Sequence, residues 1–346
     1  MSGNARALLY CAGGGIGDSL VASVVARALH SRFAHVDALT LPGHRSTLEH
    51  VPDLDGVYVD DGSDAKALAA HLRERQYDAC VVTWATPRTA LVPQLAQIPI
   101  RVGQARRLYS FRFTERVAIR SERGDVTSHW SDILLDLPRT IGCDTPDRFP
   151  KFVPTGEDKS RAASLLSDLR IAPGGYFILH PTNAIAPKRG IWPTRAWASL
   201  ANALRRQFNS TVLISGSNTD VEINKAIVRE AKDEAVVDIA GQTNIGAFGA
   251  LAQGSRAFVG ITTGSMHVSA ATGARTVGIF PFQTDFPERW APLGDRTAVV
   301  RASYPCHAGD TKETCPDYAC IANLDVPRII AATESLVAAA PSGARL

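Results

Sequence analysis

The sequence is poor in cysteine, nearly balanced in charge and free of long apolar runs. It has six cysteines in 346 residues, and Cys11, Cys80 and Cys143 stand singly, which argues against a disulfide framework and favours a reducing compartment. The 37 basic and 34 acidic side chains give a formal charge of +3, too balanced for a nucleic-acid-binding surface. Residues 1–6 lack an apolar signal core, and no segment approaches the roughly 18 consecutive apolar residues of a membrane span. We therefore expect a soluble, cytoplasmic protein with no nucleic-acid partner.

The chain is long enough for two domains, and each half alternates short apolar runs with segments of helical spacing. In the first half we expect strands at 7–11, 36–41, 57–59 and 79–83, and helices at 19–32 and 65–75. In the second half we expect strands at 176–180, 211–215, 236–239, 257–261 and 276–280, and helices at 195–208 and 221–232. This alternation predicts a doubly wound α/β fold with a parallel sheet in each half.

Pro154 and Gly156 interrupt the alternation and mark 151–160 as the linker between the halves. We therefore expect a first domain at 1–155, a second at 156–326, and at 327–346 a C-terminal helix that packs back toward the first domain, followed by a short tail.

The residues that follow the strand at 257–261 are those of an anion site. Thr262, Thr263 and Gly264 stand between that strand and a small-residue helix expected at 269–273. Backbone N–H groups at the start of a helix are unpaired and carry partial positive charge, while glycine allows close approach and threonine hydroxyls add donors. A phosphate or diphosphate would fit there, and an ordinary turn capped by threonine fits equally well.

A glycine-rich loop, Gly13 to Asp18, follows the first strand. It does not match G-x-G-x-x-G, because Asp18 or Leu20 stands at the last position, and it is not a P-loop, because no Gly-Lys-Ser/Thr follows. These absences argue against NAD binding and ATP hydrolysis. Asp18 is either a general base facing a ligand or the cap of the next helix, and its position alone favours the cap.

Several motifs occur in order along the chain. They are Gly17-Asp18, His180-Pro-Thr182 with Lys188 and Trp192-Pro193, Ser215-Gly216, and Thr263-Gly264-Ser-Met-His267 with Gly273. In this combination the sequence resembles glycosyltransferase family nine, the ADP-heptose:lipopolysaccharide heptosyltransferases, over nearly its whole length. The resemblance implies a GT-B architecture, in which two Rossmann-like domains face a cleft, the first binding the acceptor and the second the nucleotide sugar. It also implies an inverting reaction that needs no metal and no cofactor beside the ADP-sugar substrate.

The resemblance assigns roles to individual residues. Asp18 matches the family's catalytic aspartate, which takes the proton of the acceptor hydroxyl, and Lys188 matches the catalytic lysine that stabilises the diphosphate leaving group. The donor-binding residues that it implies are Thr182, Asn183, Arg189, Ser215, Gly216, Thr262, Thr263, Gly264 and His267. The acceptor-binding residues that it implies are Gly15, Gly17, Arg106, Arg107 and Arg112. The arginines belong to a basic and aromatic stretch, 101–112, which suits a phosphate- or carboxylate-bearing acceptor, and which a solvated surface explains equally well.

The sequence departs from the family's pattern at three places. Thr262 stands where the family usually has an aspartate that holds sugar hydroxyls, which puts the identity of the donor sugar in question. The interval from Lys188 to Trp192 is longer than usual, so Arg189 is an alternative to Lys188. Val24 stands where relatives often have proline, and we expect this to affect helix geometry more than chemistry.

Two further patterns are compatible with metal binding. Asp53-Leu54-Asp55 matches D-x-D, but it lies in a loop flanked by proline and glycine and is interpreted as a turn. Cys306, His307, Cys315 and Cys320 form a late cluster whose spacing is not a standard zinc pattern, so we expect no metal there and keep a metal site as the alternative.

The expected protein is an inverting, metal-independent glycosyltransferase that moves a heptose or similar sugar from an ADP-sugar to a hydroxyl of a glycan, lipid-linked or protein acceptor. Peripheral association with the inner face of the membrane is a further expectation. Two alternatives stay open, a sugar-nucleotide epimerase of the same architecture and a catalytically silent sugar-nucleotide-binding protein.

Overall fold

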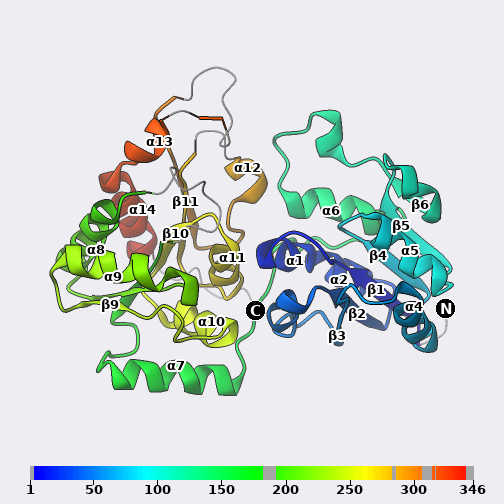
Figure 1. Ribbon diagram of the computed structural model, residues 1–346, viewed down its shortest axis with the longest axis horizontal. Coiled ribbons are helices and arrows are strands. Elements are labelled where there is room, and N and C mark those ends of the chain that lie inside the picture. The colour runs from blue at the N-terminus through cyan, green and yellow to red at the C-terminus, as the bar shows by residue number, and fades with distance from the viewer. Residues whose placement is uncertain (1–3, 182–191, 283–285, 306–313, 316, 340–346) are drawn as a thin grey trace. The chain divides into compact units, whose positions relative to one another are not determined.

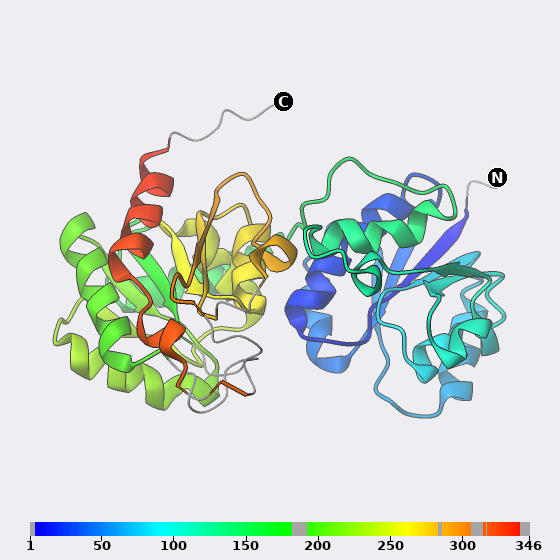
Figure 2. The ribbon, with the colours of Figure 1, turned by 90° about the horizontal axis from the view of Figure 1, so that it is seen from above.

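The computed structural model describes residues 4–181, 192–282, 286–305, 314–315 and 317–339. The chain divides into two compact units, Met1–Val153 and Pro154–Leu346. Each unit contains one six-stranded sheet, and Figures 1 and 2 show helices on both sides of each sheet. The predicted α/β class is confirmed.

The first sheet has the strand order β3-β2-β1-β4-β5-β6, and all neighbouring strands run parallel. Its strands are β1 (Arg6–Tyr10), β2 (His35–Thr40), β3 (Gly56–Val59), β4 (Ala79–Val82), β5 (Ile100–Gln104) and β6 (Glu115–Val117). In the central strand, Leu9 is in register with Ala38 of β2 and Val81 of β4, and all three side chains are fully buried. Burial on both faces explains why these strands are continuous apolar runs in the sequence.

Helices cover both faces of this sheet. They are α1 (Ile16–Ala22), α2 (Val24–Leu29), α3 (Arg45–Leu48), α4 (Ala65–Glu74), α5 (Pro87–Leu95) and α6 (Trp130–Arg139), with the short 3-10 helices η1 (Pro42–His44), η2 (Leu108–Arg112) and η3 (Arg120–Arg123). Helices α4 and α5 share a core with Leu8 and Tyr10 of β1, while α2 and α6 pack together against β1 and β5.

The helix predicted at 19–32 is two helices that meet at Ser23. The Ser23 hydroxyl donates to the carbonyl oxygen of Leu20 (2.7 Å), and a bond of this kind competes with the helical ladder. The first of the two helices begins at Ile16, earlier than predicted, so Asp18 lies in its first turn.

The second sheet repeats the first in its topology, with the order β12-β11-β10-β7-β8-β9 and parallel neighbours throughout. Its strands are β7 (Tyr176–His180), β8 (Thr211–Ile214), β9 (Val236–Asp238), β10 (Phe258–Ile261), β11 (Thr276–Phe280) and β12 (Thr297–Arg301). The helices of this unit are α7 (Gly156–Asp168), α8 (Thr194–Phe208), α9 (Val221–Ala231), α10 (Ile245–Gly254), α11 (Gly264–Ala271), α12 (Pro287–Trp290), α13 (Ala319–Ala322) and α14 (Val326–Ala338), with the 3-10 helix η4 (Asn218–Asp220).

Two predictions for the helices of the second unit can be compared with the structure. The small-residue helix predicted at 269–273 begins earlier, because α11 starts at Gly264 directly after the threonines. The C-terminal helix α14 packs on β11, β12 and α8 of its own unit, and its predicted packing toward the first domain stays a prediction. Within the described ranges, no helix is both long enough and apolar enough to span a lipid bilayer.

In each sheet the strand order reverses once, between β1 and β4 in the first unit and between β7 and β10 in the second. The connections that follow the two strands lead to opposite faces of the sheet, which leaves a crevice at their carboxyl ends. The segments after β1 and β4, and those after β7 and β10, are therefore where a ligand is expected to bind.

Gly103 of β5 lies where a side chain would strike Phe113. An added Cβ would be 2.4 Å from the nearest ring atom of Phe113, which is itself buried. We expect Gly103→Ala to lower the free energy of unfolding by about 1–3 kcal/mol, because the ring must shift within a packed core. Gly43→Ala is the matched control, since nothing lies within 4 Å of its added Cβ. Urea unfolding of both variants checks this, and equal midpoints would contradict it.

Candidate active site

Gly13 and Gly14 make room for two side chains at the end of β1. A Cβ on Gly13 would lie 2.1 Å from the Trp84 ring, and one on Gly14 would lie 2.6 Å from the carboxyl carbon of Asp18. Gly14 also has φ of +67°, which side chains other than glycine rarely adopt. The loop is therefore rich in glycine because Trp84 and Asp18 lie directly against its backbone.

Asp18 lies in the first turn of α1, three residues after the N-cap residue Gly15. Its Oδ2 accepts a hydrogen bond from the N–H of Gly15 (2.8 Å), as the acidic residue of a capping box does, so the capping alternative describes a contact that the structure contains. The same carboxylate lines a small hollow together with Trp84 and Trp130. Burial raises the pKa of Asp18 above its ordinary 3.8, although the Gly15 N–H opposes the rise. Capping and lining a site are thus done by one side chain, and the role of Asp18 as a base stays a prediction.

His44 interacts electrostatically with Asp18. Its Nδ1 lies 2.8 Å from Ser19 Oγ, and burial lowers its pKa below 6.5 in spite of the neighbouring carboxylate. The ring is therefore largely neutral at pH 7, and it adds little positive charge to the surroundings of Asp18.

A pocket of about 310 Å³ lies beside this hollow, at the carboxyl ends of β4 and β5. Such a volume is near the lower end of the range of small-molecule sites. Thr83, Trp84, Trp130 and Leu134 line both the hollow and the pocket, so a ligand in the pocket lies next to Asp18. Trp84 is 41% exposed, and an accessible indole face is suited to the apolar C–H face of a sugar ring.

The polar wall of the pocket is formed by Gln104, Arg107 and Glu122. Arg107 is ion-paired with Oε1 of Glu122 (2.7 Å), and the Gln104 amide donates to the same oxygen (2.5 Å). The second oxygen, Glu122 Oε2, is buried and has no hydrogen-bond partner among the residues that the structure describes. A buried carboxylate oxygen is normally hydrogen-bonded, so Glu122 Oε2 is available to accept a bond from a hydroxyl or a water in the pocket.

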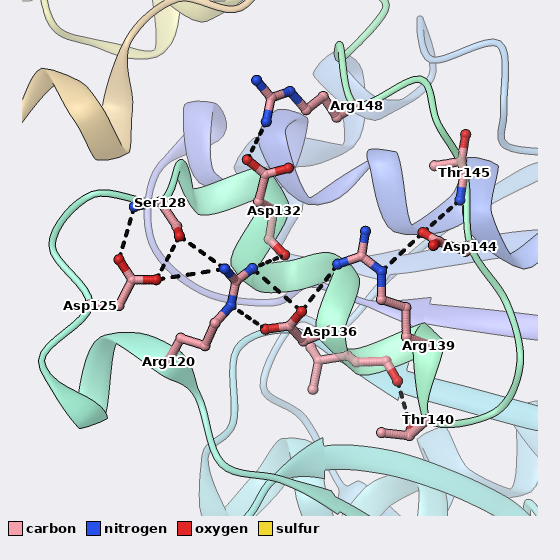
Figure 3. Close-up of polar contacts among 11 residues, drawn as sticks. Arg120, Asp125, Ser128, Asp132, Asp136, Arg139, Thr140, Asp144, Thr145 and Arg148 are labelled. Carbon is pink, nitrogen blue, oxygen red and sulfur yellow. Dashed lines mark hydrogen bonds and ion pairs between the residues drawn. The ribbon is translucent and has the colours of Figure 1, made fainter.

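An arginine holds α6, the helix that brings Trp130 to the pocket. Arg120 donates to the Asp136 carboxylate (2.6 Å) and to the backbone carbonyl of Asp132 (2.7 Å), both on α6. Figure 3 shows this guanidinium between acceptors from α6 and from the loop that precedes the helix. Arg120 belongs to η3, which also carries Glu122, so the network fixes the aromatic wall of the pocket relative to the polar one.

The three arginines predicted to bind the acceptor lie in different surroundings. Arg107 lines the pocket. Arg112 bonds to the side chain of Gln94 and lies 4.8 Å from the ring centroid of Phe111, while Arg106 is exposed. The structure therefore brings Arg107 together with Trp84, and the acceptor-binding roles of all three arginines stay predictions.

The two glycines predicted to bind the acceptor differ as well. Gly15 is exposed and its N–H is bonded to Asp18, whereas Gly17 is buried within α1. Both roles stay predictions.

In the second unit, Thr263 stands at the N-terminus of α11 without capping it. Its hydroxyl makes no bond to the first-turn N–H groups and donates instead to the carbonyl oxygen of Ile261 (3.2 Å). The alternative of an ordinary threonine-capped turn is therefore wrong. The first N–H groups of α11 therefore receive no capping bond from the Thr263 side chain, and the helix dipole adds positive charge beside Thr262 and Gly264. His267 is buried within the same helix.

The β7 strand ends in a buried histidine that lies against Ser215. Nδ1 of His180 lies 2.9 Å from Ser215 Oγ, which also donates to the carbonyl oxygen of Leu179 (3.1 Å). Burial lowers the pKa of His180 to about 4, so the ring is neutral at pH 7. The hydroxyl of Ser215 is thus engaged within the protein. Gly216 beside it is required for packing, because an added Cβ would lie 2.7 Å from that of Asp220.

Several predicted site residues lie outside the described residues and stay predictions. They are Thr182, Asn183, Lys188 and Arg189 of the donor site, and Cys306 and His307 of the cysteine cluster. Of the rest of that cluster, Cys315 is half-buried and Cys320 is buried. Among the residues that are described, no three His, Cys, Asp or Glu side chains are placed to hold a metal ion.

Comparison with known proteins places these features in a family. The profile of glycosyltransferase family 9 (heptosyltransferase) matches residues 65–318. Lipopolysaccharide heptosyltransferase 2 of Escherichia coli K12 is 26% identical over 309 residues, covering 83% of this chain and 85% of the relative. The protein of the same name from Salmonella typhimurium LT2 is 25% identical over 324 residues, covering 86% of this chain and 89% of the relative.

The solved structure of the E. coli ADP-heptose lipopolysaccharide heptosyltransferase II is similar in fold. It superposes with a TM-score of 0.78 at 21% identity, covering 95% of this chain and 98% of that one. Fold and family match together define a glycosyltransferase built from two Rossmann-like domains, the predicted GT-B class. The chain belongs to glycosyltransferase family 9, the heptosyltransferase family.

Trp84, Trp130 and Glu122 are site residues that the sequence reasoning missed. The sequence contains a signal for Trp84. This residue stands just after the buried strand β4, and β4 is the neighbour of β1, which the glycine loop follows. Trp130 and Glu122 come from a helix and a 3-10 turn with no local motif, and only the tertiary structure joins them to the pocket.

Asp18→Asn should stabilise the protein at neutral pH. Because burial raises the pKa of Asp18 in the folded chain, its ionisation disfavours folding, and this cost is absent below its ordinary pKa of 3.8. Asparagine keeps an oxygen for the Gly15 N–H and carries no charge. We expect the gain in the free energy of unfolding to be largest at pH 7 and to shrink as the pH falls through the raised pKa. Urea unfolding of both proteins across this range measures it, and a gain independent of pH would disprove the burial of the charge.

Proposed function

We propose that this protein is an inverting, metal-independent glycosyltransferase that moves a heptose from an ADP-sugar to a hydroxyl group of its acceptor. The observation that carries the proposal is the pocket of Trp84 and Trp130, which shares its wall with the Asp18 carboxylate in a chain of this family. The acceptor is a glycan, a lipid-linked molecule or a protein, and we favour a lipopolysaccharide-type glycan because both curated relatives are named for lipopolysaccharide.

Asp18 is proposed as the base of the reaction. The acceptor oxygen attacks the anomeric carbon while the bond from that carbon to the β-phosphate oxygen breaks, the hydroxyl proton passes to Asp18, and ADP leaves. Attack from the side opposite to the leaving group inverts the anomeric configuration. The raised pKa of Asp18 makes its carboxylate a stronger base than an exposed aspartate, although a proton is accepted only as the new bond forms.

The second unit is proposed to bind the ADP moiety. The uncapped start of α11 offers backbone donors to the diphosphate, with Thr263 and Gly264 beside them, and the charge that builds up on the leaving group is stabilised there. Lys188 is the proposed cation for the same group, with Arg189 as its alternative. The solved E. coli relative is named for ADP-heptose, which supports an ADP-sugar over a UDP-sugar as the donor.

The sugar of the donor depends on Thr262. This residue is half-buried at the end of β10, with its backbone N–H bonded to the carbonyl of Ile279 (2.9 Å). A threonine provides one hydroxyl and lacks the charged acceptor of an aspartate, so sugar hydroxyls are held more weakly at this position. We retain heptose as the proposed sugar.

The proposed setting is the cytoplasm, at the inner face of the membrane. A lipid-linked acceptor requires access to a bilayer, and peripheral binding supplies it without a membrane-spanning segment.

Asp18→Asn should abolish transfer and leave donor binding intact. Losing a general base slows a reaction by about 100- to 10,000-fold. We expect this loss in ADP release with donor and acceptor together, while the thermal shift caused by ADP stays that of the parent protein. Donor incubated alone should give no isomer, which separates transfer from epimerisation. Turnover close to that of the parent would remove Asp18 as the base.

Trp84→Ala should weaken acceptor binding. An aromatic face that stacks on a ligand contributes on the order of 1–2 kcal/mol, so we expect the acceptor KM to rise about tenfold with little change in the ADP-induced thermal shift. Tyr304→Ala is the matched control, because this aromatic side chain is equally exposed, at 43%, in the second unit. Steady-state kinetics at varied acceptor concentration measures the effect. An unchanged KM in Trp84→Ala, or an equal rise in both variants, would rule out the pocket as the acceptor site.

A further inference from the structure

The 3-10 helix η2 presents two large apolar side chains to solvent. Leu108 is 99% exposed and Phe111 is 61% exposed. Residues three apart in a 3-10 helix lie on the same side of it, so the two side chains form one apolar ridge. No other large apolar side chain in the described part of the chain is as exposed as either of them. Adjacent exposed apolar groups of this size mark a binding surface.

The apolar ridge, Leu108 and Phe111, stands on a rigid base. The Ser110 hydroxyl donates to the carbonyl of Gln104 (2.5 Å) and accepts the N–H of Arg107 (3.1 Å). The Tyr109 hydroxyl donates to a backbone carbonyl after β4 (2.6 Å), and the residue following the helix, Phe113, is buried in the core. Tyr109, Ser110 and Phe113 thus anchor η2, and the ridge of Leu108 and Phe111 is held outward.

Uncompensated arginines surround the ridge. Residues 101–118 contain five arginines and a single acidic residue, Glu115. Arg107 is ion-paired with Glu122. The other four form no ion pair with any residue that the structure describes, and they are Arg101, Arg106, Arg112 and Arg116.

Two of these arginines are fixed beside the ridge by backbone contacts. Arg101 donates to the carbonyl of Arg112 (2.8 Å), and Arg116 donates to that of Phe113 (3.4 Å). The guanidinium of Arg112 lies 4.8 Å from the ring centroid of Phe111 itself. The positive charge is therefore concentrated at the end of η2, next to the apolar ridge.

We propose that the apolar ridge and these arginines dock the protein on a lipid bilayer with anionic headgroups. Such a surface binds both kinds of side chain. The boundary of the acyl chains accommodates Leu108 and Phe111, while headgroup phosphates accept hydrogen bonds from the guanidinium groups. This inference takes from the proposed function only the idea that the partner is a membrane, and it involves no catalytic step.

The ridge also adjoins the acceptor pocket. A groove of about 790 Å³ beside it is lined by Pro87, Leu91 and Phe111, and Arg107 lines both this groove and the pocket of Trp84. Docking through the ridge therefore sets the bilayer surface next to the pocket, where a lipid-linked acceptor enters.

Vesicle flotation of the full-length protein tests the proposal, with vesicles that contain neither donor nor acceptor. The parent protein should float with phosphatidylcholine vesicles that contain phosphatidylglycerol, less with phosphatidylcholine alone, and less as salt is raised. The double variant Leu108→Ser/Phe111→Ser should bind about tenfold more weakly, because each side chain contributes buried apolar area. Val126→Ser, which removes an apolar side chain that is 53% exposed in the same unit, should bind as the parent does.

The circular dichroism spectrum and the urea unfolding midpoint of the double variant should equal those of the parent, which shows that it is folded. The proposal would be overturned if the double variant bound vesicles as well as the parent does. It would also be overturned if the parent bound equally well with and without phosphatidylglycerol. Self-association of the parent that is lost in the double variant, measured by sedimentation velocity, would instead assign the ridge to a second copy of the chain. Vesicle binding without transferase activity would refute the proposed function and leave this inference standing.

Discussion

Each sheet of this protein is buried on both faces, and this burial decides where chemistry can occur. A central parallel strand covered on two sides has little accessible flank, so most of its side chains are apolar, and polar side chains that can meet a ligand stand where the strands end. Reversal of the strand order beside β1 and beside β7 then opens one crevice in each unit. The glycine loop with Asp18 and the uncapped start of α11 both follow from this single constraint.

The same constraint explains how much could be predicted from the sequence. Strands such as β1 and β10 are continuous apolar runs and were predicted, whereas β6 begins with Glu115 and Arg116 at the edge of its sheet and has no such pattern. The start of α11 was missed because Gly264, Ser265 and His267 have weak helical propensity, and tertiary packing decides its conformation. Trp130 and Glu122 meet only through the folding of α6 against η3, a contact that no local pattern encodes. The roles carried over from the family at Lys188 and Thr182 fall on residues that the structure does not describe.

Asp18 shows that a structural role and a site role can belong to one side chain. Its bond to the Gly15 N–H fixes the carboxylate at the edge of the hollow, so the cap is also what orients it. From the sequence alone, capping and acting as a base are alternative roles for Asp18, because its position in the helix does not show whether the second carboxylate oxygen faces a ligand. Gly14, which a Cβ would bring into collision with Asp18, links this orientation to the backbone of the loop.

The missing cap of α11 has a consequence for the helix itself. The Thr263 hydroxyl bonds to the carbonyl of Ile261 in β10. The helix therefore lacks the stabilisation of roughly 1 kcal/mol that a capping hydroxyl would contribute. The first turn is therefore the weakest part of α11 in the unliganded protein, and it opens to solvent most readily. An anion bound there takes the place of the missing side chain. Under the proposed function, the diphosphate of the donor is that anion, and hydrogen exchange in the first turn of α11 would then measure its occupancy.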